Sequence, residues 1–243
     1  MSMGRQKPRT GVGWAVLLVS LVALTACTGG STSSTSSEPK PTMGGVARST
    51  EQPVIGLGDH PTFTVTRLRG WITAGSYVMN NTQDLNRGFL MSISVWDVGE
   101  VARNPCHSIG HLYDPGPTVE DLAAALAAQP MRNASKPVGV TLAGYSGEYI
   151  EWSVPGDMVV SDATGFAGCD VALNGFRDFV SWYGNGGEGE RLQQVAGQVD
   201  QLWILNVNGQ RLVVDATHSR NATPAQLERE GQLVQSLRFV PSS

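Results

Sequence analysis

The chain has 243 residues, with 17 Lys and Arg against 21 Asp and Glu, so its formal net charge at pH 7 is −4. A modestly acidic chain is not expected to present the positively charged surface that binds nucleic acid or anionic lipid headgroups. We therefore expect no nucleic-acid partner. The sequence contains no P-loop and no dinucleotide-binding fingerprint, and we expect no cofactor.

Residues 1–26 contain the parts of an export signal in the usual order. Three basic residues lie among the first nine, and an apolar run of thirteen residues, Val12 to Leu24, follows them. A membrane-spanning helix needs about 20 apolar residues. The shorter run therefore predicts the hydrophobic part of a secretory signal peptide.

The signal ends in Leu24-Thr25-Ala26-Cys27, which resembles the bacterial lipobox. The resemblance implies that the chain is cut before Cys27 and that the Cys27 thiol carries a diacylglycerol. Two or more acyl chains attach a protein stably to a membrane. We therefore expect a lipoprotein anchored to the extracytoplasmic face of the cell membrane. An uncleaved anchor helix and cleavage to a soluble secreted form are the alternatives.

A flexible tether is predicted for residues 27–53. This segment is rich in Ser, Thr, Gly and Pro, and it has no apolar period around which it could fold. Loss of residues 1–26 leaves 14 basic and 21 acidic residues, a formal charge of −7. The remainder, residues 54–243, has the length of one domain with a sizeable core.

The first part of this domain is predicted to form strands. Apolar residues alternate at residues 63–67, and two short apolar stretches follow between residues 70 and 79. From Gly88 to Val98 the apolar side chains fall on one face, with Ser92 and Ser94 on the other.

A helix is predicted next, over residues 119–127. Thr118 is a favourable N-cap, and Asp121 stands three residues later, where its side chain can satisfy a free N–H group. Apolar residues recur at helical spacing through this segment, and the helix is expected to end before Pro130.

Strands are expected to return after this helix. Residues 138–142 and 148–154 predict a hairpin around a turn at residues 144–147. Residues 176–183 predict another strand, followed by a glycine-rich loop.

The clearest element spans residues 199–218. Two apolar strands flank Asn208-Gly209, the preferred pair for a type I′ turn. Both strands are apolar at nearly every middle position, so we expect them at the centre of a sheet with both faces covered. A last helix begins at Thr223-Pro224. The sequence therefore predicts an α+β fold, with an antiparallel sheet of about six or more strands packed against two helices.

The segment NPCHSIGHLYDPGP, residues 104–117, has three interpretations. Export leaves Cys106 and Cys169 as a pair in an oxidising compartment, which favours a disulfide. Such a bridge would close a loop of about 64 residues and stabilise the fold by roughly 4 kcal/mol.

A metal site or a catalytic cluster is the alternative for the same segment. His107, His111 and Asp114 are plausible ligand types, and Asp170 could join them. Their spacing matches no standard zinc pattern, and we expect neither a metal site nor catalytic residues here. Solvated loop histidines are the remaining interpretation.

Trp182 and Tyr183 are the best candidates for an exposed ligand contact, because they stand beside the glycine-rich loop. Aromatic residues are more often part of a core, where each buries a large apolar area.

Four segments carry a resemblance to a known group. They are GYSGEYIEWSVP, CDVALNGF, GQVDQLWILNVNGQRLVVDATH and LEREGQLVQSLRF. These segments, within residues 105–240, resemble a secreted domain common in actinobacterial lipoproteins and membrane-anchored receptors. The order of elements is similar to that of PsbP-like α/β/α sandwiches. Neither resemblance brings a catalytic motif to this chain.

We expect a non-enzymatic lipoprotein of the cell envelope that binds or senses an envelope ligand or a protein partner. One alternative is a surface hydrolase, perhaps metal-dependent, that uses the loop of His107, His111 and Asp114. Another is an accessory structural subunit that docks on a membrane complex through an exposed apolar patch.

Overall fold

The computed structural model describes residues 51–54, 63–66, 68–74, 77–80, 90–187 and 189–240. Cys27, the predicted signal and nearly all of the predicted tether lie outside these residues. Within the described part of the chain, no helix is long and apolar enough to cross a membrane.

An antiparallel sheet of seven strands forms the middle of the domain. The expected α+β class is confirmed, because this sheet packs against two helices. Across the sheet, the strands are β3 (Trp71–Ala74), β4 (Tyr77–Asn80), β5 (Met91–Trp96), β15 (Gln210–His218), β14 (Val199–Val207), β9 (Tyr145–Ser153) and β8 (Val138–Leu142).

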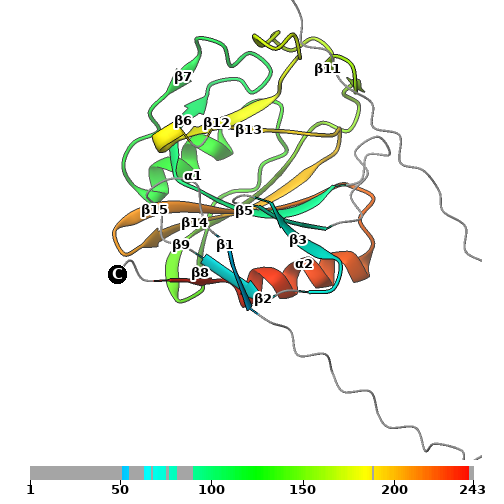
Figure 1. The fold of residues 1–243 in the computed structure, drawn as a ribbon. Helices are drawn as coiled ribbons and strands as arrows, with labels where there is room; N and C mark the ends of the chain where they lie inside the picture. The colour runs from blue at the N-terminus through cyan, green and yellow to red at the C-terminus, as the bar shows by residue number, and fades with distance from the viewer. Residues whose placement is uncertain are drawn as a thin grey trace, which may run out of the picture. The chain divides into compact units, whose positions relative to one another are not determined.

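Smaller elements cover both faces of this sheet (Figure 1). One face carries helix α1 and a four-stranded sheet, and the other carries helix α2 and a three-stranded sheet. The first group is α1 (Val119–Ala127), β13 (Glu190–Leu192), β12 (Val180–Gly184), β6 (Val98–Ala102) and β7 (Leu112–Tyr113). The second group is α2 (Pro224–Ser236), β1 (Glu51–Val54), β2 (Phe63–Thr66) and β16 (Arg238–Phe239). A short hairpin, β10 (Val160–Ser161) with β11 (Gly165–Phe166), and a 3-10 turn, η2 (Asn185–Gly187), complete the list.

The central hairpin forms as the Asn-Gly pair predicts. Asn208 and Gly209 have φ values of 54° and 92°, which only a few residue types adopt without strain. The two strands pair along nine residues, from Val199 with His218 to Val207 with Gln210. They lie inside the sheet with cover on both faces, as their continuous apolar sequence indicates.

Both helices begin directly after the N-cap residues that the sequence predicts, Thr118 and Thr223. Thr118 accepts a hydrogen bond from the Asp121 N–H, and the Asp121 carboxylate accepts one from the Thr118 N–H. Thr223 and Gln226 make the same reciprocal pair before α2, with Pro224 at the first helical position. Each capping box satisfies N–H groups that a helix leaves free at its start.

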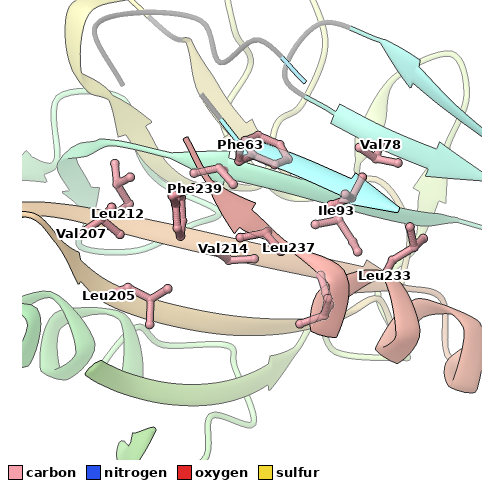
Figure 2. Close-up of a cluster of buried hydrophobic side chains, with 14 of the residues drawn as sticks. Phe63, Val78, Ile93, Leu205, Val207, Leu212, Val214, Leu233, Leu237 and Phe239 are labelled. Carbon is pink, nitrogen blue, oxygen red and sulfur yellow. The ribbon is translucent and has the colours of Figure 1, made fainter. Parts of the chain in front are cut away.

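The face of the sheet toward α2 buries one apolar cluster (Figure 2). Its side chains come from the sheet, from α2 and from the β2–β16 pair, and the ten labelled in Figure 2 each have no more than 9% of their surface exposed. Each buried side chain of this type stabilises a fold by about 1.5–3 kcal/mol relative to its exposed state. The ten labelled side chains are Phe63, Val78, Ile93, Leu205, Val207, Leu212, Val214, Leu233, Leu237 and Phe239.

Two local expectations need correction. The turn between β8 and β9 is the pair Ala143-Gly144, with φ of 53° and 88°, so residues 145–147 belong to the strand. The strand expected at residues 176–183 begins at Val180. Ser92 and Ser94, expected on the other face of their strand, are also buried, at 8% and 2% exposure, because both faces of β5 are covered.

A buried ion network joins the small sheet to the central hairpin. Arg191 on β13 donates from Nε to Asp215 Oδ2 at 2.5 Å and from Nη2 to Asp200 Oδ1 at 3.0 Å. Both carboxylates are fully buried, as is nearly all of Arg191. Asp200 also accepts hydrogen bonds from Trp152 Nε1 at 2.7 Å and from Gln198 Nε2 at 2.8 Å. One guanidinium therefore holds two layers together.

The two carboxylates differ in their pKa values. Burial raises the pKa of Asp215 to about 6, because the charge of Arg191 only partly offsets its desolvation. Burial acts on Asp200 in the same direction, but the charges of Arg191 and Arg132 and the hydrogen bonds from Gln198 and Trp152 outweigh it. The pKa of Asp200 is therefore below its ordinary value.

We expect the substitution Arg191→Met to lower the free energy of unfolding by about 3–5 kcal/mol, because it removes the guanidinium that pairs directly with both buried carboxylates. Chemical denaturation at pH 7 measures this loss. The control Arg103→Met removes an exposed arginine that stacks over Tyr113, and it should cost less than about 1 kcal/mol. Adding Asp215→Asn to Arg191→Met should restore part of the lost free energy of unfolding. A loss in Arg103→Met as large as that in Arg191→Met would contradict this account.

Candidate functional site

The structure joins Cys106 and Cys169 by a disulfide, with an S–S distance of 2.04 Å. Cys106 follows β6, and Cys169 lies in the segment between β9 and β12. The backbone strengthens this junction, since the Asp170 N–H donates to the Cys106 carbonyl at 2.9 Å and the Val180 N–H donates to the Pro105 carbonyl at 2.8 Å. The segment 104–117 is thus one side of a stapled junction.

His107 and Asp170 form a polar clasp across the disulfide. His107 Nδ1 lies 3.0 Å from Asp170 Oδ1, and the Ile109 N–H donates to Asp170 Oδ2 at 3.3 Å. These contacts lower the pKa of Asp170, with the hydrogen bond to His107 as the largest cause. Both oxygens of the Asp170 carboxylate therefore hold the turn that follows Cys106.

The other residues considered for a metal do not gather with this pair. Asp114 Oδ1 accepts a hydrogen bond from the Gly116 N–H at 2.8 Å, which shapes the turn before α1. The backbone of His111 bonds to Ser108 and to Arg103. In the described ranges, no three His, Cys, Asp or Glu side chains are close enough together to hold a metal ion.

Residues 155–179 form a lobe, which we call the disulfide lobe. It contains the hairpin β10–β11 and connects β9 to β12. Its small core consists of the cystine, Phe166, Phe179 and the preceding Val154, all buried. Figure 1 shows β11 in this lobe at the end of the domain opposite α2 and β2.

A groove of about 810 Å³ lies between the disulfide lobe and the segments that follow β13 and β15. This volume is within the range of ligand pockets, about 300–1,000 Å³. Apolar and polar side chains both line it. The apolar ones are Met158, Val160, Phe166, Phe176, Leu192, Val195 and Ala196, and the polar ones are Ser161, Asp162, Asn174, Arg177, Asp178, Gln193, Gln194, Arg220 and Asn221.

Hydrogen bonds between buried side-chain amides hold the floor of the groove in place. Gln193 is 4% exposed, and its Nε2 donates to Ser181 Oγ at 2.9 Å. Its Oε1 accepts a hydrogen bond from Gln198 Nε2 at 2.5 Å, and the same nitrogen lies 2.8 Å from Asp200 Oδ1. The groove floor is therefore connected to the buried ion network.

Charged groups of both signs stand around the groove. Arg177 Nη1 donates to the Cys169 carbonyl at 2.6 Å, which orients its guanidinium. Arg220 is exposed, and its Nη1 donates to the Gly156 carbonyl at 3.3 Å. Burial and, next, the charge of Glu190 raise the pKa of Asp178. The site can thus offer donors, acceptors and apolar surface to one ligand.

The expectation of an exposed Trp182-Tyr183 contact is wrong for Trp182. Its side chain is 0% exposed, because the ring packs between Trp96 and Trp152 with centroid distances of 5.9 and 6.0 Å. Tyr183 is half-buried, and burial together with a hydrogen bond to Glu190 raises its pKa. β12 is buried from Val180 to Trp182 and becomes half-buried from Tyr183 to its end.

Sequence reasoning missed the lining of the groove. Residues 155–179 have no apolar period, so they offered no pattern for a site. The usable signal was the dipeptide Asn174-Gly175, typical of an exposed turn, with Leu173 and Phe176 beside it. Leu173 is 110% exposed and Phe176 is 40% exposed, but only Phe176 lines the groove.

Two solved structures are similar to this chain. LpqN, described as involved in cell envelope biogenesis of Mycobacterium tuberculosis, is 12% identical with a TM-score of 0.39, and the match covers 79% of this chain and 91% of that chain. The cyanobacterial PsbP (CyanoP) from Synechocystis sp. PCC 6803 is 12% identical with a TM-score of 0.34, and the match covers 82% and 98%. Neither likeness assigns a ligand or an activity to this chain.

No protein-family model matches the sequence, and no curated protein matches it.

We expect the double substitution Cys106→Ser and Cys169→Ser to lower the free energy of unfolding by roughly 4 kcal/mol at most, because the bridge closes a long loop in the unfolded chain. Hydrogen exchange should become faster most strongly in residues 157–178, and in β14 and β15 only by as much as the global free energy of unfolding falls. His107→Ala, which keeps the disulfide, is the control and should cost less than about 1 kcal/mol. Equal exchange in the lobe with and without the bridge would contradict its role as a staple.

Proposed function

We propose that this protein is a lipid-anchored binding protein of the cell envelope, and that its ligand occupies the groove beside the disulfide lobe. The observation that carries this proposal is a groove of about 810 Å³ with walls fixed by a cystine and a floor fixed by buried amides. Preorganised walls lower the entropy that a site loses when a ligand binds.

Two features support a place outside the cytoplasm. The first 27 residues have a basic start, a short apolar run and a lipobox-like end at Cys27. The disulfide is of the kind that persists in oxidising compartments and is rare in the cytosol. The anchor would be the diacylglycerol on Cys27, and residues 27–53 would connect it to the domain.

The chemistry of the groove supports an amphipathic ligand. Phe176, Val160 and Val195 offer apolar surface, and the side-chain amides of Asn174, Gln194 and Asn221 offer hydrogen bonds. Arg177 and Arg220 add positive charge, while Asp162 and Asp178 add acceptors. Envelope peptides, glycans with lipid parts and lipid headgroups combine these features.

Binding fits this site better than hydrolysis does. The residues considered for a hydrolase have other partners, because His107 contacts Asp170 and Asp114 shapes a turn. The lining of the groove has no nucleophile held by a neighbouring base, which acyl-transfer chemistry requires.

We expect Cys27→Ser to move the protein from the membrane fraction to the soluble fraction, because the substitution removes the thiol that accepts the lipid. Fractionation with detection of the domain measures the change, and the mass of the N-terminal peptide of the native protein should include a diacylglycerol. A Cys27→Ser protein that stays in the membrane fraction, or a native Cys27 without lipid, would contradict the anchor.

We expect Phe176→Ser to weaken ligand binding about three- to eightfold, because the ligand would bury the 40% of Phe176 that is exposed and full burial of a Phe contributes about 1.5–3 kcal/mol. The thermal unfolding midpoint is measured against a panel of envelope peptides, oligosaccharides and lipids, and the compounds that raise it are titrated against both proteins. Leu173→Ser is the matched control, since Leu173 is an exposed apolar residue of the same turn that does not line the groove.

The control should bind like the native protein. Equal weakening in the two variants would place the ligand elsewhere, and no response to any panel member would count against the binding role itself.

A further inference from the structure

Strand β8 is a bare edge of the seven-stranded sheet. It pairs with β9 on one side, from Val138 with Tyr149 to Leu142 with Tyr145. On its other side, residues 138–142 form no hydrogen bond to any residue that the structure describes. A row of unpaired N–H and C=O groups is a template for another strand.

Three usual protections of such an edge are missing within residues 138–142, although Lys136 and Pro137 directly precede them. The sequence of β8, VGVTL, contains no charge and no proline, and its pairing with β9 runs without a bulge. Natural sheets protect a free edge with these devices because an unprotected one joins other chains. Val138 adds apolar surface, with 54% of its side chain exposed.

We propose that β8 is a dimer interface, at which the β8 strands of two copies of this chain pair in antiparallel fashion around a two-fold axis at Val140. This arrangement would join two seven-stranded sheets into one. A two-fold interface uses the same patch on both copies and closes on itself, so it does not lead to open fibres.

The sequence of β8 is complementary to itself in this register. Val140 would face Val140 of the second copy, and Val138 would face Leu142, all on one face of the sheet. Gly139 would face Thr141 on the other face. Directly opposed residues of an antiparallel pair share a face, so apolar side chains meet apolar ones, and no like charges oppose each other.

The two ends of β8 also complement each other. At the Leu142 end, the sheet is covered, because Tyr145 packs on Phe239 of β16 with ring centroids 5.5 Å apart. At the Val138 end, the neighbouring rings of Tyr149 and Trp203 are only partly buried. Antiparallel pairing brings the covered end of one copy to the open end of the other.

A second copy fits this edge better than an unrelated extended peptide. A peptide would gain backbone hydrogen bonds along only about 17 Å of strand. A second copy brings the same bonds and, in addition, its own covered face beside Tyr149 and Trp203. The proposal is independent of the ligand in the groove.

Disulfide trapping in the full-length protein tests this register. Val140→Cys places two thiols on the proposed axis, where directly opposed Cβ atoms are about 4.5–5.5 Å apart, and it should yield a covalent dimer under mild oxidation. Val138→Cys should form a dimer only when mixed with Leu142→Cys. Ile72→Cys, an exposed position on the opposite edge strand β3, is the control, and it should yield roughly tenfold less dimer.

A charge at the exposed end of β8 provides a second test that does not depend on repacking. Val138→Lys, added to Val140→Cys, should abolish the covalent dimer while the circular dichroism spectrum and unfolding midpoint remain those of Val140→Cys alone. The mass of the native full-length protein in detergent should be that of a dimer that dissociates on dilution.

Three results would overturn the proposal. The first is a native protein that stays monomeric at every concentration, and the second is Ile72→Cys cross-linking as well as Val140→Cys. The third is a Val140→Cys chain that links only to a different protein, which would assign the edge to another partner.

Discussion

The ion network around Arg191 sets the arrangement of the domain. The strands of the central hairpin are apolar on both faces, so hydrophobicity alone would tolerate a shift of one residue, which exchanges the faces of every side chain. Asp200 and Asp215 remove this freedom, because both must face the buried guanidinium of Arg191. The Asn208-Gly209 turn fixes the pairing of β14 with β15, and the Arg191 contact fixes the face of this hairpin on which the small sheet lies.

The same network reaches the candidate site. Gln198 contacts Asp200 on one side and Gln193 on the other, and Gln193 is part of the groove floor. The polar groups that orient the small sheet thus also hold one surface of the groove. The disulfide lobe supplies the opposite wall, so the site lies between a part fixed by charge and a part fixed by a covalent bond.

Local signals in the sequence predict much of this fold. The Asn208-Gly209 turn, the capping boxes at Thr118 and Thr223, and the apolar character of residues 199–218 each depend on neighbouring residues alone, and the structure has all of them. The α+β class follows from their order. The disulfide could be predicted from the number of cysteines and the predicted export signal alone.

Long-range contacts decide the rest. Trp182 adjoins a glycine-rich loop in sequence, but in space it lies between two other tryptophans, and no local pattern shows this. Arg191 belongs to a three-residue strand, where a buried arginine is not expected from sequence. The groove lining comes from three separate segments, so its existence depends on how they meet.

The cystine also determines where a binding site of this kind exists. In a reducing cytosol the two thiols would stay apart, and the lobe would be held only by weak contacts such as His107 with Asp170. Under oxidising conditions the disulfide holds the lobe against β6. If the protein is exported as we propose, the redox state of its surroundings decides where the groove becomes rigid, because only an oxidising compartment forms this bond.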